Sequence, residues 1–91
     1  MVKLDEQAVA KNLKGLPDWE RHDEVMKRLF EFEDFERALA FVNKVAEVAK
    51  KLDHHPDIDI RYNKVTLTLT THSAGGLTEK DFLMAREINA L

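Results

Sequence analysis

The chain has 91 residues, of which 44% are hydrophobic and 34% charged, a balance typical of one small folded domain rather than a disordered segment. It contains no cysteine, which excludes disulfides and fits a reducing compartment. The net charge is −3 with both signs interspersed, so we expect neither nucleic acid nor a membrane surface as a partner. No apolar signal segment or membrane-spanning run is present, and we expect a single cytoplasmic domain over residues 1–91.

The first third of the chain predicts a short helix followed by two strands. Asp5–Leu13 carries apolar residues at helical spacing, and Gly15 stands where a C′ glycine would end a helix. Trp19–His22 and Val25–Phe32, separated by two acidic residues, are typical of an antiparallel strand pair.

The strongest helical pattern covers Asp34–Leu52. Asp34 is a suitable N-cap, and Lys50 and Lys51 complement the carboxyl end of the helix dipole. A continuous apolar stripe runs along one face of this segment, formed by Phe35, Ala38, Leu39, Val42, Val45, Ala46, Ala49 and Leu52.

A hairpin is predicted next. Ile58–Tyr62 and Val65–Leu69 both alternate apolar and polar residues, and Asn63-Lys64 is suited to a two-residue turn. This turn would place Tyr62 opposite Val65, with the apolar residues of both strands on one buried side.

The last helix has a specific start signal. Thr78 is the expected N-cap, Asp81 occupies the reciprocal position of a capping box, and Leu77 and Phe82 have the spacing of a hydrophobic staple. The resulting order α-ββ-α-ββ-α predicts an α+β fold, in which three helices pack on one face of a four-stranded antiparallel sheet.

Three of the four histidines are expected to converge. His54 and His55 follow the long helix, and the hairpin register brings His55 roughly level with His72. For any one of these histidines taken alone, a polar residue in a solvated loop is the simpler interpretation. Together they favour general acid–base chemistry, because histidine exchanges protons near neutrality. A metal site is the weaker alternative, since neither an HxH or HxxxH spacing nor a cysteine is present.

The histidines belong to a longer spaced pattern that resembles the signature of pterin-4a-carbinolamine dehydratases. The phrases KLDHHPD, YNKVTLTLTTH and GGLTEKD strengthen the resemblance, which extends over essentially the whole chain. The pattern consists of Lys50, His54, His55, Pro56, Tyr62, His72 and Asp81.

The resemblance implies a dehydratase (a hydro-lyase) that converts 4a-hydroxytetrahydropterin into quinonoid dihydropterin in pterin recycling, with neither a metal nor an organic cofactor. It implies homodimers or homotetramers, built by extending the sheet across subunits. The catalytic residues would be His54, His55 and His72. The pterin would be bound by His54, His55, Pro56, Thr71, His72, Ser73 and Ala74, with Lys50, Asp53, Tyr62 and Asp81 as further candidates.

Three points leave alternatives open. Lys50 stands where well-known members carry an active-site glutamate, and Ile58 replaces a common aromatic residue. Capping alone can explain Asp81 without a catalytic role. A vertebrate member also serves as dimerisation cofactor of a homeodomain transcription factor, so a non-catalytic, homo-oligomeric protein-binding module is the rival interpretation.

Overall fold

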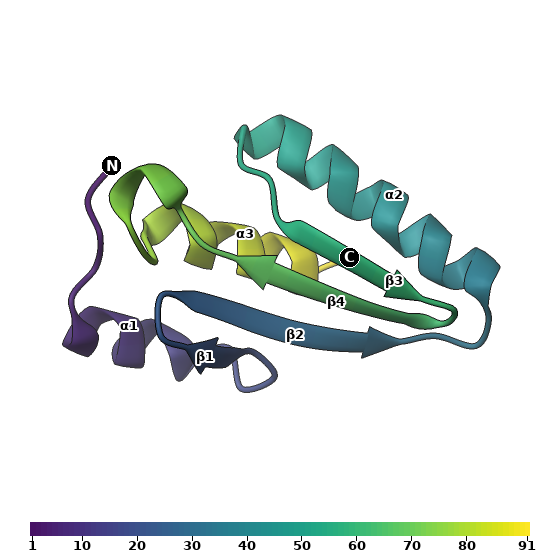
Figure 1. The fold of residues 1–91 in the computed structure, drawn as a ribbon, viewed down its shortest axis with the longest axis horizontal. Coiled ribbons are helices and arrows are strands. Elements are labelled where there is room, and N and C mark those ends of the chain that lie inside the picture. The colour runs from purple at the N-terminus through teal and green to yellow at the C-terminus, as the bar shows by residue number, and fades with distance from the viewer.

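The computed structural model describes residues 1–91, and its elements follow the predicted order α-ββ-α-ββ-α (Figure 1). The helices are α1 (Glu6–Leu13), α2 (Phe35–Leu52) and α3 (Glu79–Asn89), with a 3-10 turn η1 (His72–Ala74) before α3. The strands are β1 (Glu20–His22), β2 (Val25–Glu31), β3 (Asp57–Arg61) and β4 (Lys64–Leu69). No helix combines the length and apolarity needed to cross a bilayer.

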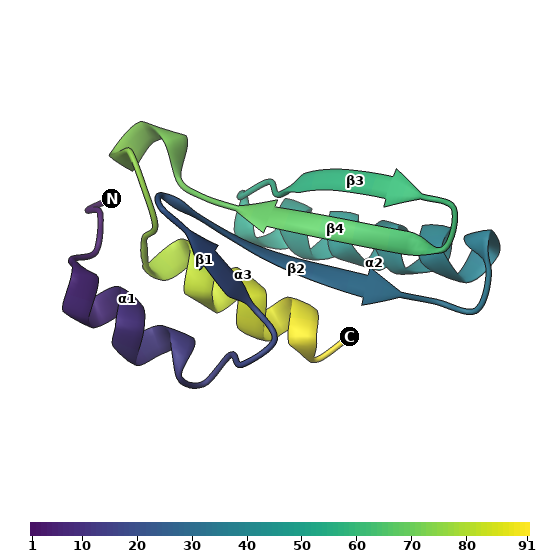
Figure 2. The same cartoon turned by 60° about the horizontal axis from the view of Figure 1, so that its bottom comes forward.

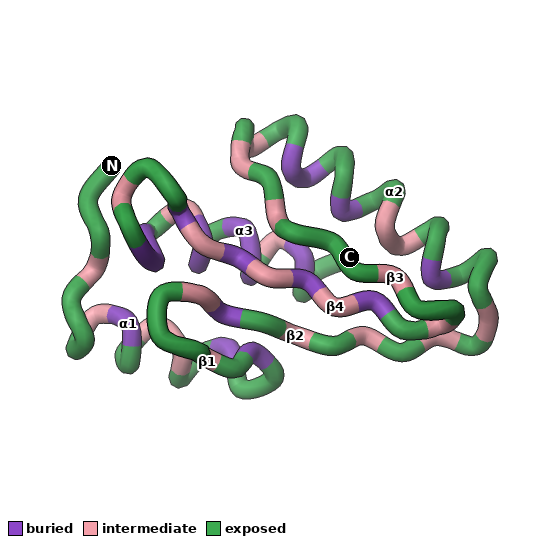
Figure 3. The backbone as a smooth tube through the Cα atoms, viewed as in Figure 1, coloured by how far each residue is buried: buried purple, intermediate pink, exposed green.

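The four strands form one antiparallel sheet in the order β1-β2-β4-β3. Figure 2 shows α2 and α3 behind this sheet and α1 at its β1 end, which confirms the predicted α+β class. Because β4 lies between two strands, Val65, Leu67 and Leu69 are fully buried on the helical side. Buried residues accordingly alternate along β4, and they also follow the inner sides of α2 and α3 (Figure 3).

The helix starts are those expected from local sequence. The Asp34 side chain accepts a hydrogen bond from the Arg37 N–H, and Thr78 and Asp81 form the capping box of α3. Leu77 and Phe82 are both buried beside that box. Because these contacts join residues a few positions apart, sequence spacing alone is sufficient to predict them.

The β3–β4 hairpin differs from the prediction. Arg61 pairs with Lys64 and Ile60 with Val65, so the turn is Tyr62-Asn63 and the register is shifted by two residues. The cause lies outside the hairpin: Phe32 N–H donates to the Asn63 carbonyl at 2.9 Å, and the Asn63 amide donates to the Phe32 carbonyl at 2.8 Å. A shift of two preserves which face each strand residue occupies. Tyr62, however, moves into the turn at φ 54° and is 69% exposed, and Ile58 on the edge strand β3 is also exposed, so the predicted burial of these two residues is wrong.

Candidate active site

The chain leaves α2 through a left-handed residue, and this geometry places the two adjacent histidines. Asp53 has φ 52° and ψ 47°, and the His54 N–H donates to the Ala49 carbonyl at 3.1 Å. These are the marks of a Schellman ending, which reverses the chain direction after a helix. His54 and His55 then lie in the irregular segment between α2 and β3, and their side chains contact different parts of the protein.

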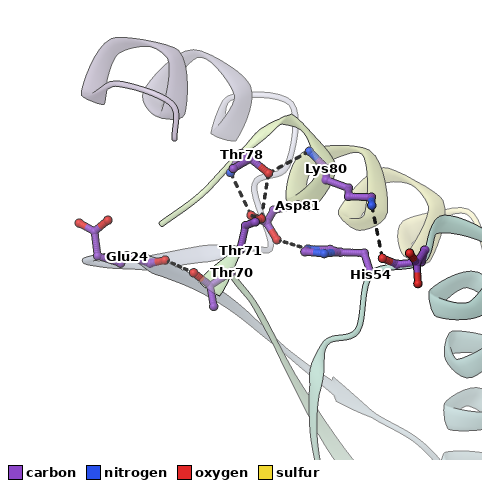
Figure 4. Close-up of polar contacts among 8 residues, drawn as sticks. Glu24, His54, Thr70, Thr71, Thr78, Lys80 and Asp81 are labelled. Carbon is purple, nitrogen blue, oxygen red and sulfur yellow. Dashed lines mark hydrogen bonds and ion pairs between the residues drawn. The ribbon is translucent and has the colours of Figure 1, made fainter. Parts of the chain in front are cut away.

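His54 points toward the N-terminus of α3. Its Nε2 lies 2.5 Å from Oδ1 of Asp81, a contact between residues 27 positions apart (Figure 4). The His54 side chain is only 11% exposed and the Asp81 side chain is fully buried. An ionised carboxylate can only accept, so His54 Nε2 must carry the hydrogen of this bond.

The other carboxylate oxygen of Asp81 accepts hydrogen bonds from Thr71 and Thr78, which lie before and after η1 in the chain. Oδ2 accepts from the Thr78 N–H at 2.9 Å and from the Thr71 hydroxyl at 2.8 Å. The Thr71 and Thr78 hydroxyl oxygens are 2.8 Å apart. Because the one hydroxyl hydrogen of Thr71 goes to the carboxylate, the Thr78 hydroxyl donates to Thr71. No buried side-chain polar atom lacks a partner, so the orientation of Asp81 is determined by its neighbours.

His55 lies in a different environment. It lines a groove of about 410 Å³ between the end of α2 and the start of β3. The groove combines apolar walls with one acidic and one basic side chain, and it is lined by Ala46, Ala49, Lys50, Asp53, His55, Pro56 and Ile58. Its volume is within the range of small-molecule sites.

His72, Ser73 and Ala74 form η1, directly after the buried Thr71. The loop is closed at its base by a bridge between Thr71 and Gly76, and Gly75 turns it at φ 76°. His72 itself is exposed. Asp81 therefore contacts His54 directly and reaches the His72 loop through the Thr71 hydroxyl.

The predicted site residues thus occupy three adjoining places. His54, Thr71 and Asp81 share one hydrogen-bond network, the η1 loop follows it, and Lys50, Asp53, His55 and Pro56 line the groove. Tyr62 is not brought to them: it lies in the hairpin turn, at the opposite end of β3 from His54. Its inclusion came from its place in the spaced pattern of the resembling family, and the structure shows no contact between Tyr62 and the three histidines.

Two contributors were not predicted from sequence. The Thr78 hydroxyl extends the Asp81 network, and Lys80 Nζ donates to the Asp53 carbonyl at 3.3 Å, which ties α3 to the end of α2 (Figure 4). The capping-box spacing in the sequence indicates Thr78, whereas no local sequence pattern indicates the contact of Lys80. No group of three or more His, Asp or Glu side chains is arranged to hold a metal ion.

Comparison with known proteins adds independent information. The family model described as pterin 4 alpha carbinolamine dehydratase matches residues 2–91. A protein of Acidobacterium capsulatum is 54% identical over 91 residues, which is all of this chain and 99% of that protein. A protein of Thermomicrobium roseum is 50% identical over all of this chain and 98% of its own length. Both carry the provisional name pterin-4-alpha-carbinolamine dehydratase.

Two solved structures are also similar. A Brucella melitensis protein described as a transcriptional coactivator/pterin dehydratase has 43% identity and a TM-score of 0.92, covering 97% of this chain and 96% of that one. A pterin dehydratase-like protein described as a RuBisCO assembly factor of the alpha-carboxysome has 20% identity and a TM-score of 0.64. It covers 79% of this chain and 83% of its own, and at that identity it supports the fold alone.

Proposed function

Since the chain belongs to the pterin 4 alpha carbinolamine dehydratase family, we propose that it is a cytoplasmic dehydratase that removes water from 4a-hydroxytetrahydropterin to give quinonoid dihydropterin. The observation that carries the proposal is the 2.5 Å contact between His54 and the buried Asp81, beside a groove that contains His55. A histidine held in one orientation next to a small-molecule groove is suited to proton transfer.

The reaction requires two proton movements and no redox step. One proton goes to the hydroxyl on C4a, which leaves as water, and the hydrogen on N5 is removed as the C4a=N5 double bond forms. One substrate therefore gives one product and one water, and a single acid–base cycle restores the protein. Histidines can perform both transfers near neutral pH, so metal or organic cofactor is not required in this proposal.

We assign the proton transfers to His54 and His72 and the orientation of the pterin to His55. His54 is oriented by Asp81, and the His72 loop begins at Thr71, which donates to the same carboxylate. His55 lies in the groove, where it can contact a flat bound ring. In this assignment Asp81 is a positioning residue that acts through its neighbours.

A pterin-dehydration assay on the purified protein tests the proposal. We expect turnover by the natural sequence and a loss of about 10²–10⁴ in kcat for His54→Ala, the typical contribution of positioned acid–base catalysis. His22→Ala is the matched control, because His22 is exposed on β1 and outside the site. Absence of turnover by the folded natural protein would contradict the proposal.

The rival function, a non-catalytic homo-oligomeric binding module, is favoured by exposed apolar side chains. Phe35 and Leu39 on α2 are 42% and 40% exposed, and β1 and β3 are both edge strands. The Brucella relative is itself described as both a coactivator and a pterin dehydratase. We propose that the protein forms homodimers or homotetramers, which is compatible with either function, and the dehydration assay separates the two.

A further inference from the structure

The loop that carries His72 is held at its two ends rather than along its length. This His72 loop comprises residues 71–76, and the hydrogen bonds of residues 72–75 all stay within it. The N–H groups of Ala74 and Gly75 each donate to the Thr71 carbonyl at 3.0 Å, and the Thr71 N–H donates to the Gly76 carbonyl at 3.0 Å across the base. Because the loop is closed on itself, the position of His72 relative to the rest of the site depends on what holds the ends.

Glu24, in the turn between β1 and β2, contacts both ends of the His72 loop. Its carbonyl accepts from the Thr70 hydroxyl at 2.6 Å, directly before the loop (Figure 4). Its carboxylate Oε2 lies 2.5 Å from Lys3 Nζ, and this ion pair covers Gly76 at the far end of the loop. A Cβ atom on Gly76 would collide with the Glu24 oxygen and lie 2.8 Å from Lys3 Cε. The ion pair and the loop are therefore in direct contact.

The N-terminal segment that supplies Lys3 is itself fixed beside the loop. The Leu4 N–H donates to the Leu77 carbonyl at 2.9 Å, and both Figure 1 and Figure 2 show the N-terminus near η1. Gly76 is buried beneath the ion pair, whereas His72 is exposed. Three segments that are remote in sequence thus meet at the end of the His72 loop.

Neither stability nor backbone geometry explains this arrangement. The side chains of Lys3 and Glu24 are each 47% exposed, and exposed ion pairs contribute little to the free energy of unfolding. Gly75 is the only glycine with a positive φ, so the backbone at Gly76 does not itself require glycine. The absence of a side chain at residue 76 instead allows the ion pair to approach the loop closely.

We propose that Lys3 and Glu24 are positioning residues for His72, because their ion pair on Gly76 fixes the second end of the His72 loop. The Asp81 network holds the first end at Thr71. This role rests on the proposed dehydratase function, in which His72 transfers a proton. Proton transfer requires heavy atoms within about 2.6–3.2 Å of each other, so a loop released at one end slows the reaction by displacing His72.

Charge reversal tests the ion pair. Lys3→Glu and Glu24→Lys each place two like charges beside Gly76, which replaces an attraction by a repulsion of similar size. We expect each to lower kcat by about three- to tenfold, equivalent to about 0.7–1.4 kcal/mol of barrier. The double variant Lys3→Glu/Glu24→Lys restores an ion pair and should recover most of the lost kcat.

Arg37→Glu is the matched control for charge reversal. Arg37 forms a comparable exposed ion pair with Asp34 at 2.7 Å, at the start of α2 and at the opposite end of the sheet from η1 (Figure 1). Its reversal should leave kcat unchanged.

Gly76→Ala tests the same contact without a change of charge. The added methyl group meets the Glu24 carboxylate and the Lys3 side chain, so the ion pair must move away from the loop. We expect kcat to fall as in the charge reversals. Gly15→Ala is the matched control, because a Cβ atom there meets only the Asn12 carbonyl, at 3.8 Å, and kcat should not change. Circular dichroism checks that every variant is folded.

Two measurements distinguish the positioning of His72 from a general loss of structure. In a His72→Ala background, Lys3→Glu should cause no further loss of kcat, because the residue that the ion pair positions is gone. Hydrogen exchange of the amides in residues 71–77 should be about three- to tenfold faster in Lys3→Glu and should return to the natural rate in the double reversal. A full additional loss in the His72→Ala background, or an unchanged kcat in the folded reversals, would overturn the positioning role.

Hydrogen exchange does not require turnover, so it separates this role from the proposed function. Faster exchange in Lys3→Glu that the double reversal corrects, in a protein without turnover, would support the hold of the ion pair on the loop and contradict the dehydratase. Turnover by the natural protein, with the same kcat and the same exchange in Lys3→Glu, would support the dehydratase and overturn the role of the ion pair.

Discussion

Replacing Asp81 by asparagine separates the two tasks that its carboxylate combines. The asparagine oxygen can occupy the place of Oδ2 and still accept from the Thr78 N–H and the Thr71 hydroxyl. The NH₂ group of the asparagine then faces His54 Nε2. In the natural protein this nitrogen is the partner of Asp81 Oδ1 and carries the hydrogen of their bond. Two donors cannot bond to each other, so the His54 ring must change to the Nδ1–H tautomer or turn away.

The magnitude follows from the three hydrogen bonds that lose their charged acceptor. Bonds to a charged group contribute about 1.5–3 kcal/mol and neutral ones about 0.5–1.5 kcal/mol. Since asparagine keeps two of the three, we expect the lost bond to His54 to lower the free energy of unfolding by about 1.5–3 kcal/mol, which lowers Tm by about 6–24 °C in a domain of this size. The altered His54 tautomer should also reduce kcat by about 10²–10⁴. If Asp81 served only as a helix cap, the variant would lose stability but keep its kcat.

Circular-dichroism melting and steady-state kinetics below the melting transition measure the two effects separately, and a pH–rate profile reports on the tautomer. Asp34→Asn is the matched control. Asp34 caps α2 by accepting from the Arg37 N–H, far from the site in sequence, and asparagine is an equally good N-cap. Wild-type kcat and an unchanged pH profile in folded Asp81→Asn would refute the positioning role.

Four further outcomes are expected. His54→Ala and His72→Ala should each lower kcat by up to about 10²–10⁴, whereas His55→Ala should mainly raise KM; near-full kcat in both of the first two would refute the assignment. The Arg21 guanidinium holds the pKa of the Glu6 carboxyl below its usual value, mainly through their hydrogen bond. Glu6→Gln should therefore lower stability at neutral pH and lose its effect as pH falls through the depressed pKa, which melting at several pH values checks. Elemental analysis should find no stoichiometric metal, and activity lost on chelation would contradict this. Light scattering across a dilution series should show an oligomer. A monomer at micromolar concentration would contradict this prediction.

The element order, the helix caps and the central strand could all be predicted from the sequence, because each depends on residues close together in the chain. Asp34 and Thr78 cap their helices through hydrogen bonds to N–H groups two or three residues later. The alternation of Val65, Leu67 and Leu69 with threonines is a pattern of period two, which places the core face of β4 directly. Such contacts leave a signal at short, regular spacing.

The hairpin register and the network around Asp81 were decided by tertiary structure. Asn63 is held by Phe32 across 31 residues, and with this contact the turn lies one position earlier than local preference favours, which shifts the strand pairing by two residues. The Asp81 contact with His54 spans 27 residues and requires both the left-handed end of α2 at Asp53 and the N-terminus of α3. Spacing along the chain carries no information on which distant side chains meet, because that depends on how the helices and strands pack against one another.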